Sequence, residues 1–157
     1  MIGLRRGLVR GARISALGVH VPERVLTNDE ISQFLDTSDD WILTRTGIRE
    51  RRIARVDEAA SDLGEVAARR CLEHGALDAA ELDLVIVATI SPDHIMPATA
   101  SIVADKIGAI KAGAFDVQAG CTGFVYGLAI ATAFVSANIY TNVLVVGAEV
   151  LSKMVDW

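Results

Sequence analysis

The chain contains few cysteine, proline and aromatic residues and no excess of positive charge. Its two cysteines, Cys71 and Cys121, stand far apart and form neither a CxxC metal motif nor a disulfide framework. We therefore expect no metal site and a reducing cytoplasm. The formal net charge of −5 argues against nucleic-acid binding, because proteins of that class usually present a basic surface to the phosphates.

The sequence also lacks a recognisable signal peptide. Residues 1–10 carry arginines but no apolar core of signal-peptide length, and we interpret them as a short extension ahead of the first strand. The uncharged stretch between Val117 and Ala148 is long enough to raise the question of a membrane span. Glycines and asparagines interrupt this stretch, so we expect no span but a turn, a buried helix and a strand in an α/β core.

Apolar residues are abundant, at 52% of the chain, which is enough for a sizeable core without disulfide or metal staples. The pattern predicts strands at 11–21, 82–89, 114–117 and 142–147, and helices near 26–30, 38–45, 60–74, 99–107 and 122–136. Strands that alternate with helices indicate an α/β fold with a mostly parallel sheet covered on both faces. The basic segment at residues 49–55 is expected to be irregular.

The segment around Cys121 has the composition of a sharp turn between a strand and a helix. Small residues at Ala119, Gly120 and Gly123 surround the cysteine, as around the nucleophile of a hydrolase elbow. A thiol attacks as the thiolate, and the unpaired N–H groups and dipole of a helix N-terminus stabilise that anion. Spacing alone leaves open a buried, inert cysteine, which is the interpretation that we give to Cys71 on its helix.

Four blocks of sequence resemble the β-ketoacyl-[acyl-carrier-protein] synthase III family of condensing enzymes, which belongs to the thiolase superfamily. The blocks are DVQAGCTGFVYGL at 116–128, LDTSDDWILTRTGIRERRI at 35–53, GVHVPERVLTN at 18–28 and VVGAEVLSK at 145–153. The resemblance extends over about residues 14–157. It implies a layered αβαβα, thiolase-like fold, of which residues 1–157 would be the N-terminal half, with the C-terminal half absent from this chain.

The resemblance implies the initiating condensation of type II fatty acid synthesis. An acyl group, commonly acetyl, would move from coenzyme A to a cysteine, and malonyl-acyl-carrier-protein would then lose CO₂ and attack it. Acyl-coenzyme A would be a substrate, so no cofactor is expected. A homodimer is implied as well.

The same resemblance assigns roles to particular residues. Cys121 would be the acylated nucleophile. Trp41 would stack on the adenine of coenzyme A, and Thr37 and Arg45 would contact its nucleotide. Met96 would reach into the acyl pocket of the partner subunit. From the residues alone, Trp41 is a half-buried helix anchor, Arg45 a surface charge and Met96 ordinary loop packing.

Other features leave alternatives open. Four arginines could attract phosphates or an acidic carrier protein, or could lie in a solvated loop: Arg49, Arg51, Arg52 and Arg55.

The family's catalytic His and Asn would lie in the second half, and His20, His74 and His94 do not match that His. We therefore expect the chain to acylate poorly alone and a second polypeptide to complete it. Alternatives are a related polyketide-starter synthase and a non-catalytic half for dimerisation or partner binding.

Overall fold

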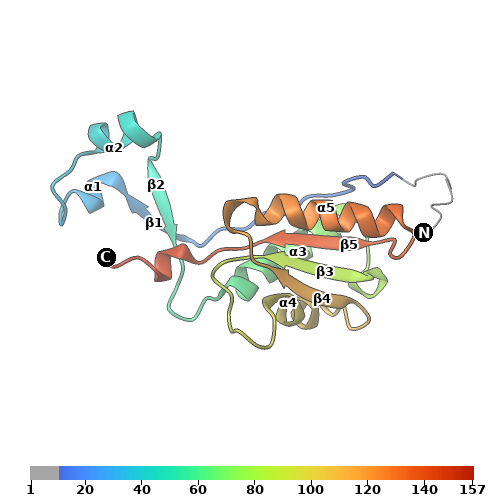
Figure 1. Ribbon diagram of the computed structural model, residues 1–157. Coiled ribbons are helices and arrows are strands. Elements are labelled where there is room, and N and C mark those ends of the chain that lie inside the picture. Colours follow the sequence, from blue (N-terminus) through green and yellow to red (C-terminus); the bar gives the residue numbers. More distant parts are fainter. Residues whose placement is uncertain (1–10) are drawn as a thin grey trace. The chain divides into compact units, whose positions relative to one another are not determined.

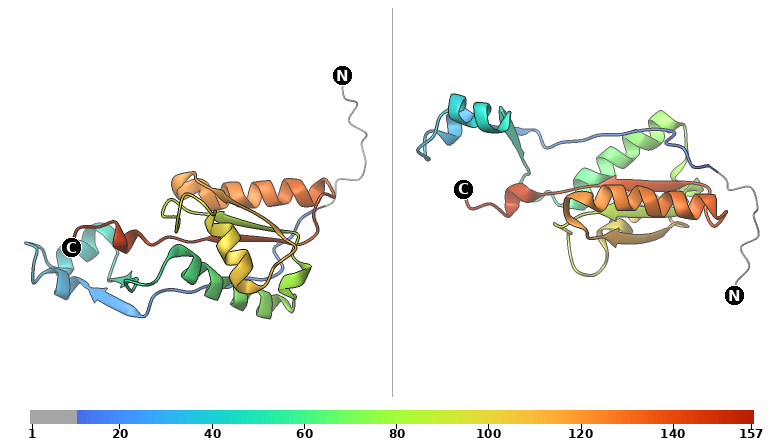
Figure 2. Two further views of the ribbon diagram at one scale, coloured as in Figure 1. Left: turned by 90° about the horizontal axis from the view of Figure 1, so that it is seen from below. Right: turned by 45° about the horizontal axis from the view of Figure 1, so that its top comes forward.

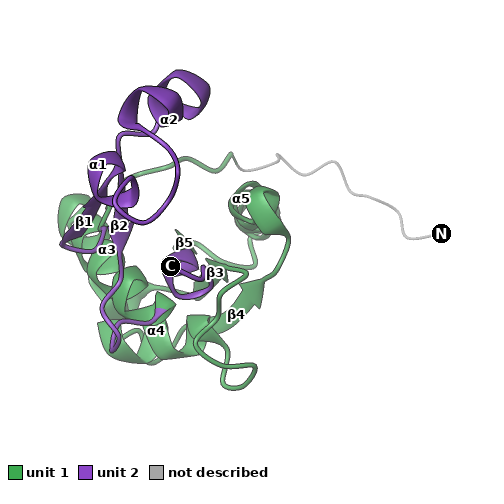
Figure 3. Ribbon diagram, turned by 90° about the vertical axis from the view of Figure 1, so that its left-hand side faces the viewer, with its two compact units in different colours: residues 1–20, 60–149 green, residues 21–59, 150–157 purple. Residues whose placement is uncertain are grey.

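The computed structural model of the protein describes residues 11–157, which belong to two compact units (Figures 1 and 3). Unit 1 comprises residues up to His20 together with Ala60–Glu149, and unit 2 comprises Val21–Ala59 and Val150–Trp157. The short extension expected at residues 1–10 lies outside the described residues. Each unit has its own elements and is described separately below.

Unit 1 is built on a parallel sheet of three strands in the order β4-β3-β5. The strands are β3 (Leu84–Ala88), β4 (Gly113–Val117) and β5 (Val143–Gly147). Every residue of β3 is buried, because the strand is paired on both sides and covered on both faces. The parallel, doubly covered sheet predicted from the sequence is confirmed.

Helices cover the two faces of this sheet. Figures 1 and 3 show α3 (Ala60–Gly75) and α4 (Thr99–Ile107) on one face and α5 (Gly123–Ser136) on the other. Ala131 of α5 is buried in one cluster with Leu84 and Ile86 of β3. Two short 3-10 helices, η1 (Ala79–Glu81) and η2 (Gly120–Thr122), complete the unit. All three of these predicted α-helices are therefore present.

The first strand predicted from the sequence, at residues 11–21, is wrong. Residues 11–20 pair with no strand in the described part of the chain and instead follow α3 (Figure 2). Arg70 Nη1 donates to the Val19 carbonyl at 2.7 Å, and His74 Nδ1 lies 3.0 Å from the Leu17 oxygen. The apolar alternation correctly indicates an extended backbone, but side chains of a helix supply these hydrogen bonds in place of a neighbouring strand.

Unit 2 contains a small antiparallel pair of strands, β1 (Arg24–Thr27) and β2 (Glu50–Ile53). With α1 (Asn28–Ile31) and α2 (Asp39–Thr46) they enclose a core of Leu26, Ile31, Ile42 and Ile53. The expectation of an irregular segment at 49–55 is therefore wrong. Its arginines do not prevent a strand, because Arg51 and Arg52 donate to Asn28 and Pro22 while Ile53 fills the apolar core.

The last residues of the chain are part of unit 2. The backbone N–H of Ala54 donates to Ser152 Oγ at 3.1 Å, and Lys153 Nζ donates to the Val56 carbonyl at 2.7 Å. Ser152, the acceptor of the first bond, and Lys153, the donor of the second, both belong to the 3-10 helix η3 (Leu151–Lys153). The two bonds join two segments that lie far apart in the sequence.

No helix among residues 11–157 is long and apolar enough to cross a membrane. The uncharged stretch is divided among the cysteine turn, α5 and β5, as the sequence predicts.

Asp83 joins the segments that lead into β3 and β5, and it makes the stability of unit 1 sensitive to acid. Its carboxylate accepts hydrogen bonds from the backbone N–H groups of Thr141 (2.7 Å) and Asn142 (3.0 Å). The bonds from Asn142 and then Thr141 lower the pKa of Asp83 below its ordinary value. A group with a lowered folded-state pKa stabilises the fold above its unfolded pKa of about 3.9, and this contribution is lost as the pH falls through the folded-state pKa.

Replacing Asp83 by asparagine should therefore lower the melting temperature at neutral pH by a few degrees. The difference from the wild type should shrink as the pH falls through the acid range, because the wild type then loses the same carboxylate. Thermal unfolding followed by circular dichroism at a series of pH values measures this. A constant difference at every pH would contradict the assignment.

Candidate functional site

Cys121 lies in the short turn between β4 and α5, within η2 and immediately before the helix. Gly120 has a φ of 55°, in the left-handed region that favours glycine. The Thr122 hydroxyl donates to the Ala119 carbonyl at 2.8 Å and closes the turn. The predicted order of strand, turn and helix is confirmed. Cys121 is exposed and lies two residues before Gly123, the first residue of α5.

The two cysteines of the chain differ in their surroundings. Cys71 on α3 is partly buried, and this burial raises the pKa of its thiol above the usual value. Cys121 is exposed on its turn. A buried, protonated thiol is a poor nucleophile, so the structure supports the inert role that the sequence analysis gives to Cys71. The nucleophilic role of Cys121 stays a prediction.

The strand order brings three connections to one edge of the sheet. The carboxyl ends of β4, β3 and β5 lie side by side, and they are followed by Cys121, Thr89 and Glu149. The Thr89 N–H donates to the Val117 carbonyl at 3.2 Å, which ties the end of β3 to that of β4. From β3 the chain continues to β4 on one side of β3, and from β4 it crosses to β5 on the other side of β3. Open α/β sheets bind their ligands at such a switch in strand order.

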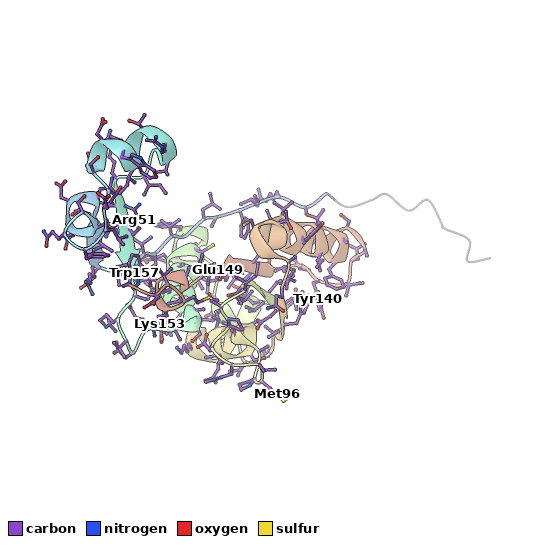
Figure 4. All side chains as sticks on the ribbon, turned by 60° about the vertical axis from the view of Figure 1, so that its left-hand side comes forward. Arg51, Met96, Tyr140, Glu149, Lys153 and Trp157 are labelled. Atoms are coloured by element: carbon purple, nitrogen blue, oxygen red, sulfur yellow. The ribbon has the colours of Figure 1, made fainter. Side chains whose placement is uncertain are left out.

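Glu149 holds the connection that follows β3. Its carboxylate accepts hydrogen bonds from the Ile90 N–H at 3.0 Å and from the Ser91 hydroxyl at 2.5 Å. The loop that begins there, residues 91–98, ends in a cis peptide bond between Met96 and Pro97. Met96 is 85% exposed, and Figure 4 shows its side chain at the periphery. The loop packing that the residues alone suggested for Met96 is therefore wrong.

Helix α2 in unit 2 presents the residues predicted for nucleotide binding. Ser38 caps it by accepting the Trp41 N–H at 3.1 Å. The guanidinium carbon of Arg45 lies 4.3 Å from the centroid of the Trp41 ring, which is a cation–π distance. The Trp41 side chain is 51% exposed, whereas Ile42 is the buried residue of this helix. The binding role of Trp41 and Arg45 stays a prediction, because a half-buried helix anchor would show the same exposure.

Thr37 directly precedes the N-cap of α2. Its Oγ1 is buried and has no hydrogen-bond partner among residues 11–157. A buried hydroxyl without a partner costs about 1–3 kcal/mol, so a ligand group that paired with this oxygen would recover that free energy. Trp41 and Arg45 are thus brought together, and Thr37 lies one turn away in the sequence with unused hydrogen-bonding capacity.

The arginines near β2 do not form a free basic cluster. Three of the four are bound to neighbours within unit 2: Arg51 to Asn28, Arg52 to Glu50 and Pro22, and Arg55 to Asp57 and Glu58. Arg49 is exposed. The observation favours a local structural role over the attraction of phosphates. Within residues 11–157 no group of three or more His, Cys, Asp or Glu side chains is placed to hold a metal ion.

Sequence reasoning misses two carboxylates at the cysteine edge of the sheet. Asp116 in β4 accepts the backbone N–H groups of Thr99 and Ala100 at the start of α4, and Glu149 holds the loop after β3. A signal for them exists in the sequence, because they are the nearest charged residues on either side of the uncharged stretch. A charge kept at the border of a buried segment needs hydrogen-bond partners.

The sequence is similar to known proteins over nearly its whole length. Residues 115–157 match the family described as 3-Oxoacyl-[acyl-carrier-protein (ACP)] synthase III. The beta-ketoacyl-[acyl-carrier-protein] synthase III of Caldanaerobacter subterraneus subsp. tengcongensis is 52% identical over 146 residues, which cover 93% of this chain and 44% of that protein. That of Desulfitobacterium hafniense is 53% identical over 144 residues, or 92% of this chain and 44% of the relative.

Solved structures show the same likeness. The 3-oxoacyl-[acyl-carrier-protein] synthase III of Aquifex aeolicus is 46% identical with a TM-score of 0.90, over 94% of this chain and 47% of that one. The priming beta-ketosynthase of the R1128 polyketide biosynthetic pathway is 40% identical with a TM-score of 0.92, over 98% and 46% of the two chains. This chain thus spans less than half the length of these relatives.

The layered sheet, with a cysteine at the sharp turn before a central helix, is that of a thiolase-like α/β protein. The shared identity narrows the class further. The chain is similar to the N-terminal half of proteins of the β-ketoacyl-[acyl-carrier-protein] synthase III family, as the sequence blocks predict.

Proposed function

We propose that this chain is the acyl-accepting half of a β-ketoacyl-[acyl-carrier-protein] synthase III, and that Cys121 takes an acyl group of the acetyl type from coenzyme A. The observation that carries the proposal is the exposed thiol at the carboxyl edge of the sheet, between the left-handed Gly120 and the first turn of α5. The proposed pathway is the initiating step of type II fatty acid synthesis. The proposed compartment is the cytoplasm, and the proposed assembly is a homodimer.

The acylation step follows from thiol chemistry. Cys121 loses its proton to solvent, its thiolate attacks the thioester carbonyl, and the oxygen becomes an oxyanion that backbone N–H groups at the start of α5 can stabilise. Collapse of this intermediate forms the acyl-cysteine and expels the coenzyme A thiolate, which takes up a proton. In the second half-reaction, malonyl-acyl-carrier-protein loses CO₂ and its carbanion attacks the acyl group, which releases Cys121. The His and Asn for that step are proposed to come from a C-terminal half.

The surface of α5 supports this requirement for a second half. Its exposed apolar side chains include Phe124, Val125 and Tyr126, which are 42%, 63% and 54% exposed. A contiguous apolar surface of this kind on one helix is usually covered by a partner. We propose that the C-terminal half covers it, and we use "complete enzyme" below for this chain combined with such a half.

The acylation test uses the complete enzyme, with the chain alone for comparison. Incubation with acetyl-coenzyme A followed by intact-mass measurement and peptide mapping should show one acetyl group on Cys121. Addition of malonyl-acyl-carrier-protein should remove it and yield the β-ketoacyl product. No acetylation in the complete enzyme, or acetylation confined to Cys71, would refute the proposal.

Trp41 provides a test of coenzyme A binding. Stacking of a base on an aromatic side chain contributes about 1–3 kcal/mol, so Trp41→Ala should weaken coenzyme A binding by roughly tenfold. Titration calorimetry of the complete enzyme measures the change. The control is Phe34→Ala, because Phe34 lies in the same unit and is equally exposed, at 52%. An equal affinity loss in both variants would contradict a stacking role for Trp41.

A second candidate, a polyketide-starter synthase, is supported by the likeness to the R1128 priming ketosynthase. Comparison of acetyl-coenzyme A with longer and branched acyl-coenzyme A thioesters in the same mass assay separates the two. A non-catalytic half that serves dimerisation or partner binding is distinguished by the thiols. It predicts that iodoacetamide labels Cys121 no faster than Cys71.

A further inference from the structure

Asp116 caps a helix that belongs to another part of the chain. Helix α4 begins at Thr99 with Ala98 at its N-cap, and no side chain caps it locally. The Asp116 carboxylate accepts the N–H of Thr99 at 2.8 Å and that of Ala100 at 2.7 Å, one with each oxygen. Both residues are fully buried. Without Asp116, two N–H groups of the first turn of α4 would lose their hydrogen-bond partner.

The same carboxylate connects the two functional segments of unit 1. Asp116 lies in β4, whose carboxyl end leads directly to Cys121, and Thr99 directly follows the loop that carries Met96. The base of that loop is closed by a hydrogen bond of 3.1 Å from the Asp93 N–H to Thr99 Oγ1. The tip is different, because Ile95 and Met96 are 101% and 85% exposed. This hydrogen bond lies at the base of the loop and not at its exposed tip.

We propose that Asp116 is a positioning residue that fixes the Met96 loop relative to the strand of Cys121 and thereby affects which acyl-chain lengths are accepted. The inference rests on the proposed function, and on the role that the family resemblance implies for Met96, which would reach into the acyl pocket of the partner subunit. A carboxylate shared by a strand and a helix N-terminus is suited to this role, because the charge is stabilised by the helix dipole and both oxygens are fixed in direction.

The test separates two roles of Asp116: a tether, meaning a connection between β4 and the start of α4, and a simple cap of α4. Asp116→Asn removes the charge and one acceptor, while Asp116→Asn combined with Ala98→Ser restores a cap within α4 but not the connection to β4. The matched control is Asp83→Asn, since Asp83 also accepts two backbone N–H groups but lies at the opposite, amino end of β3. Each variant of the complete enzyme is assayed for kcat/KM with acetyl-, butyryl- and hexanoyl-coenzyme A.

Asp116→Asn should change the ratio of kcat/KM between the shortest and the longest substrate by roughly fivefold or more. Ala98→Ser should recover the melting temperature but not this ratio, and Asp83→Asn should leave the ratio unchanged. In a Met96→Ala background Asp116→Asn should have no further effect on the ratio. Recovery of the ratio by Ala98→Ser would show a cap only and overturn the proposal, as would an equal shift in Asp83→Asn.

A separate measurement distinguishes failure of this inference from failure of the proposed function. If the wild type does not acylate Cys121, the proposed function is wrong. The tether is then judged from hydrogen exchange of residues 91–98 and from iodoacetamide labelling of Cys121, neither of which needs acyl transfer. Both rates should rise several-fold in Asp116→Asn with or without Ala98→Ser. Unchanged rates would overturn the tether itself.

Discussion

Replacing Cys121 by alanine should abolish the acyl-enzyme, with a loss of at least roughly 10³-fold in the rate of condensation. The substitution removes the only thiol at the carboxyl edge of the described sheet, since the other cysteine, Cys71, lies on α3. Cys71→Ala should leave acylation intact, because burial raises the pKa of that thiol and keeps it protonated. Intact-mass measurement after incubation of the complete enzyme with acetyl-coenzyme A distinguishes the two variants.

Stability provides the control for this comparison. Cys121 is exposed and no hydrogen bond of its side chain is needed to close the turn, so Cys121→Ala should change the free energy of unfolding by less than about 0.5 kcal/mol. Cys71 is partly buried, and its replacement should cost about 1 kcal/mol. Cys121→Ala is thus expected to be the more stable of the two variants, so unfolding cannot explain its loss of acylation. Persistent acylation of Cys121→Ala would mean that another residue accepts the acyl group.

Alkylation by iodoacetamide compares the reactivity of Cys121 and Cys71 without any substrate. Cys121 should be alkylated several-fold faster than Cys71 in the wild-type complete enzyme, since alkylation needs an accessible thiolate. Equal rates would favour the non-catalytic alternative.

The parallel sheet and its helices could be predicted because apolar residues recur with the local period of each element. The same period determines which backbone groups pair within a helix and which side chains face the core. The continuous apolar run that forms β3 and the small residues around Cys121 are signals of this kind. The segment at 11–20 could not be placed, because its pattern specifies an extended backbone but not the partner of its carbonyl groups. Here Arg70 and His74 of α3 supply that partner.

The candidate site was predictable only in part, for a similar reason. The roles of Cys121, Trp41 and Arg45 were predicted through the family resemblance, because from the residues alone Trp41 is a helix anchor and Arg45 a surface charge. The structure places the Arg45 guanidinium over the Trp41 ring, at a spacing of one helical turn. Asp116 and Glu149 act on segments that are distant along the chain. The register of the sheet determines from which N–H groups a carboxylate accepts hydrogen bonds. That register depends on the whole fold.

Among the glycines that the structure describes, Gly18 should be the one at which an added methyl group lowers stability most. A Cβ on Gly18 would lie 2.2 Å from the Ala67 carbonyl oxygen and 2.4 Å from the Cys71 nitrogen. Both atoms belong to the backbone of α3, so neither can move without disturbing the helix. Gly18→Ala should therefore displace the extended segment and lower the free energy of unfolding by about 3 kcal/mol, or the melting temperature by roughly 6–12 °C.

The matched control is Gly11→Ala in the same segment, because a Cβ on Gly11 would meet no atom within 4 Å. That variant should unfold within about 0.5 kcal/mol of the wild type. Cys71 reports the local change independently, since the Gly18 backbone lies directly on it. Its alkylation by iodoacetamide should accelerate in Gly18→Ala and not in Gly11→Ala. An unchanged melting temperature together with an unchanged Cys71 rate would mean that residues 11–20 do not lie on α3, and that they are free to pair elsewhere as a strand.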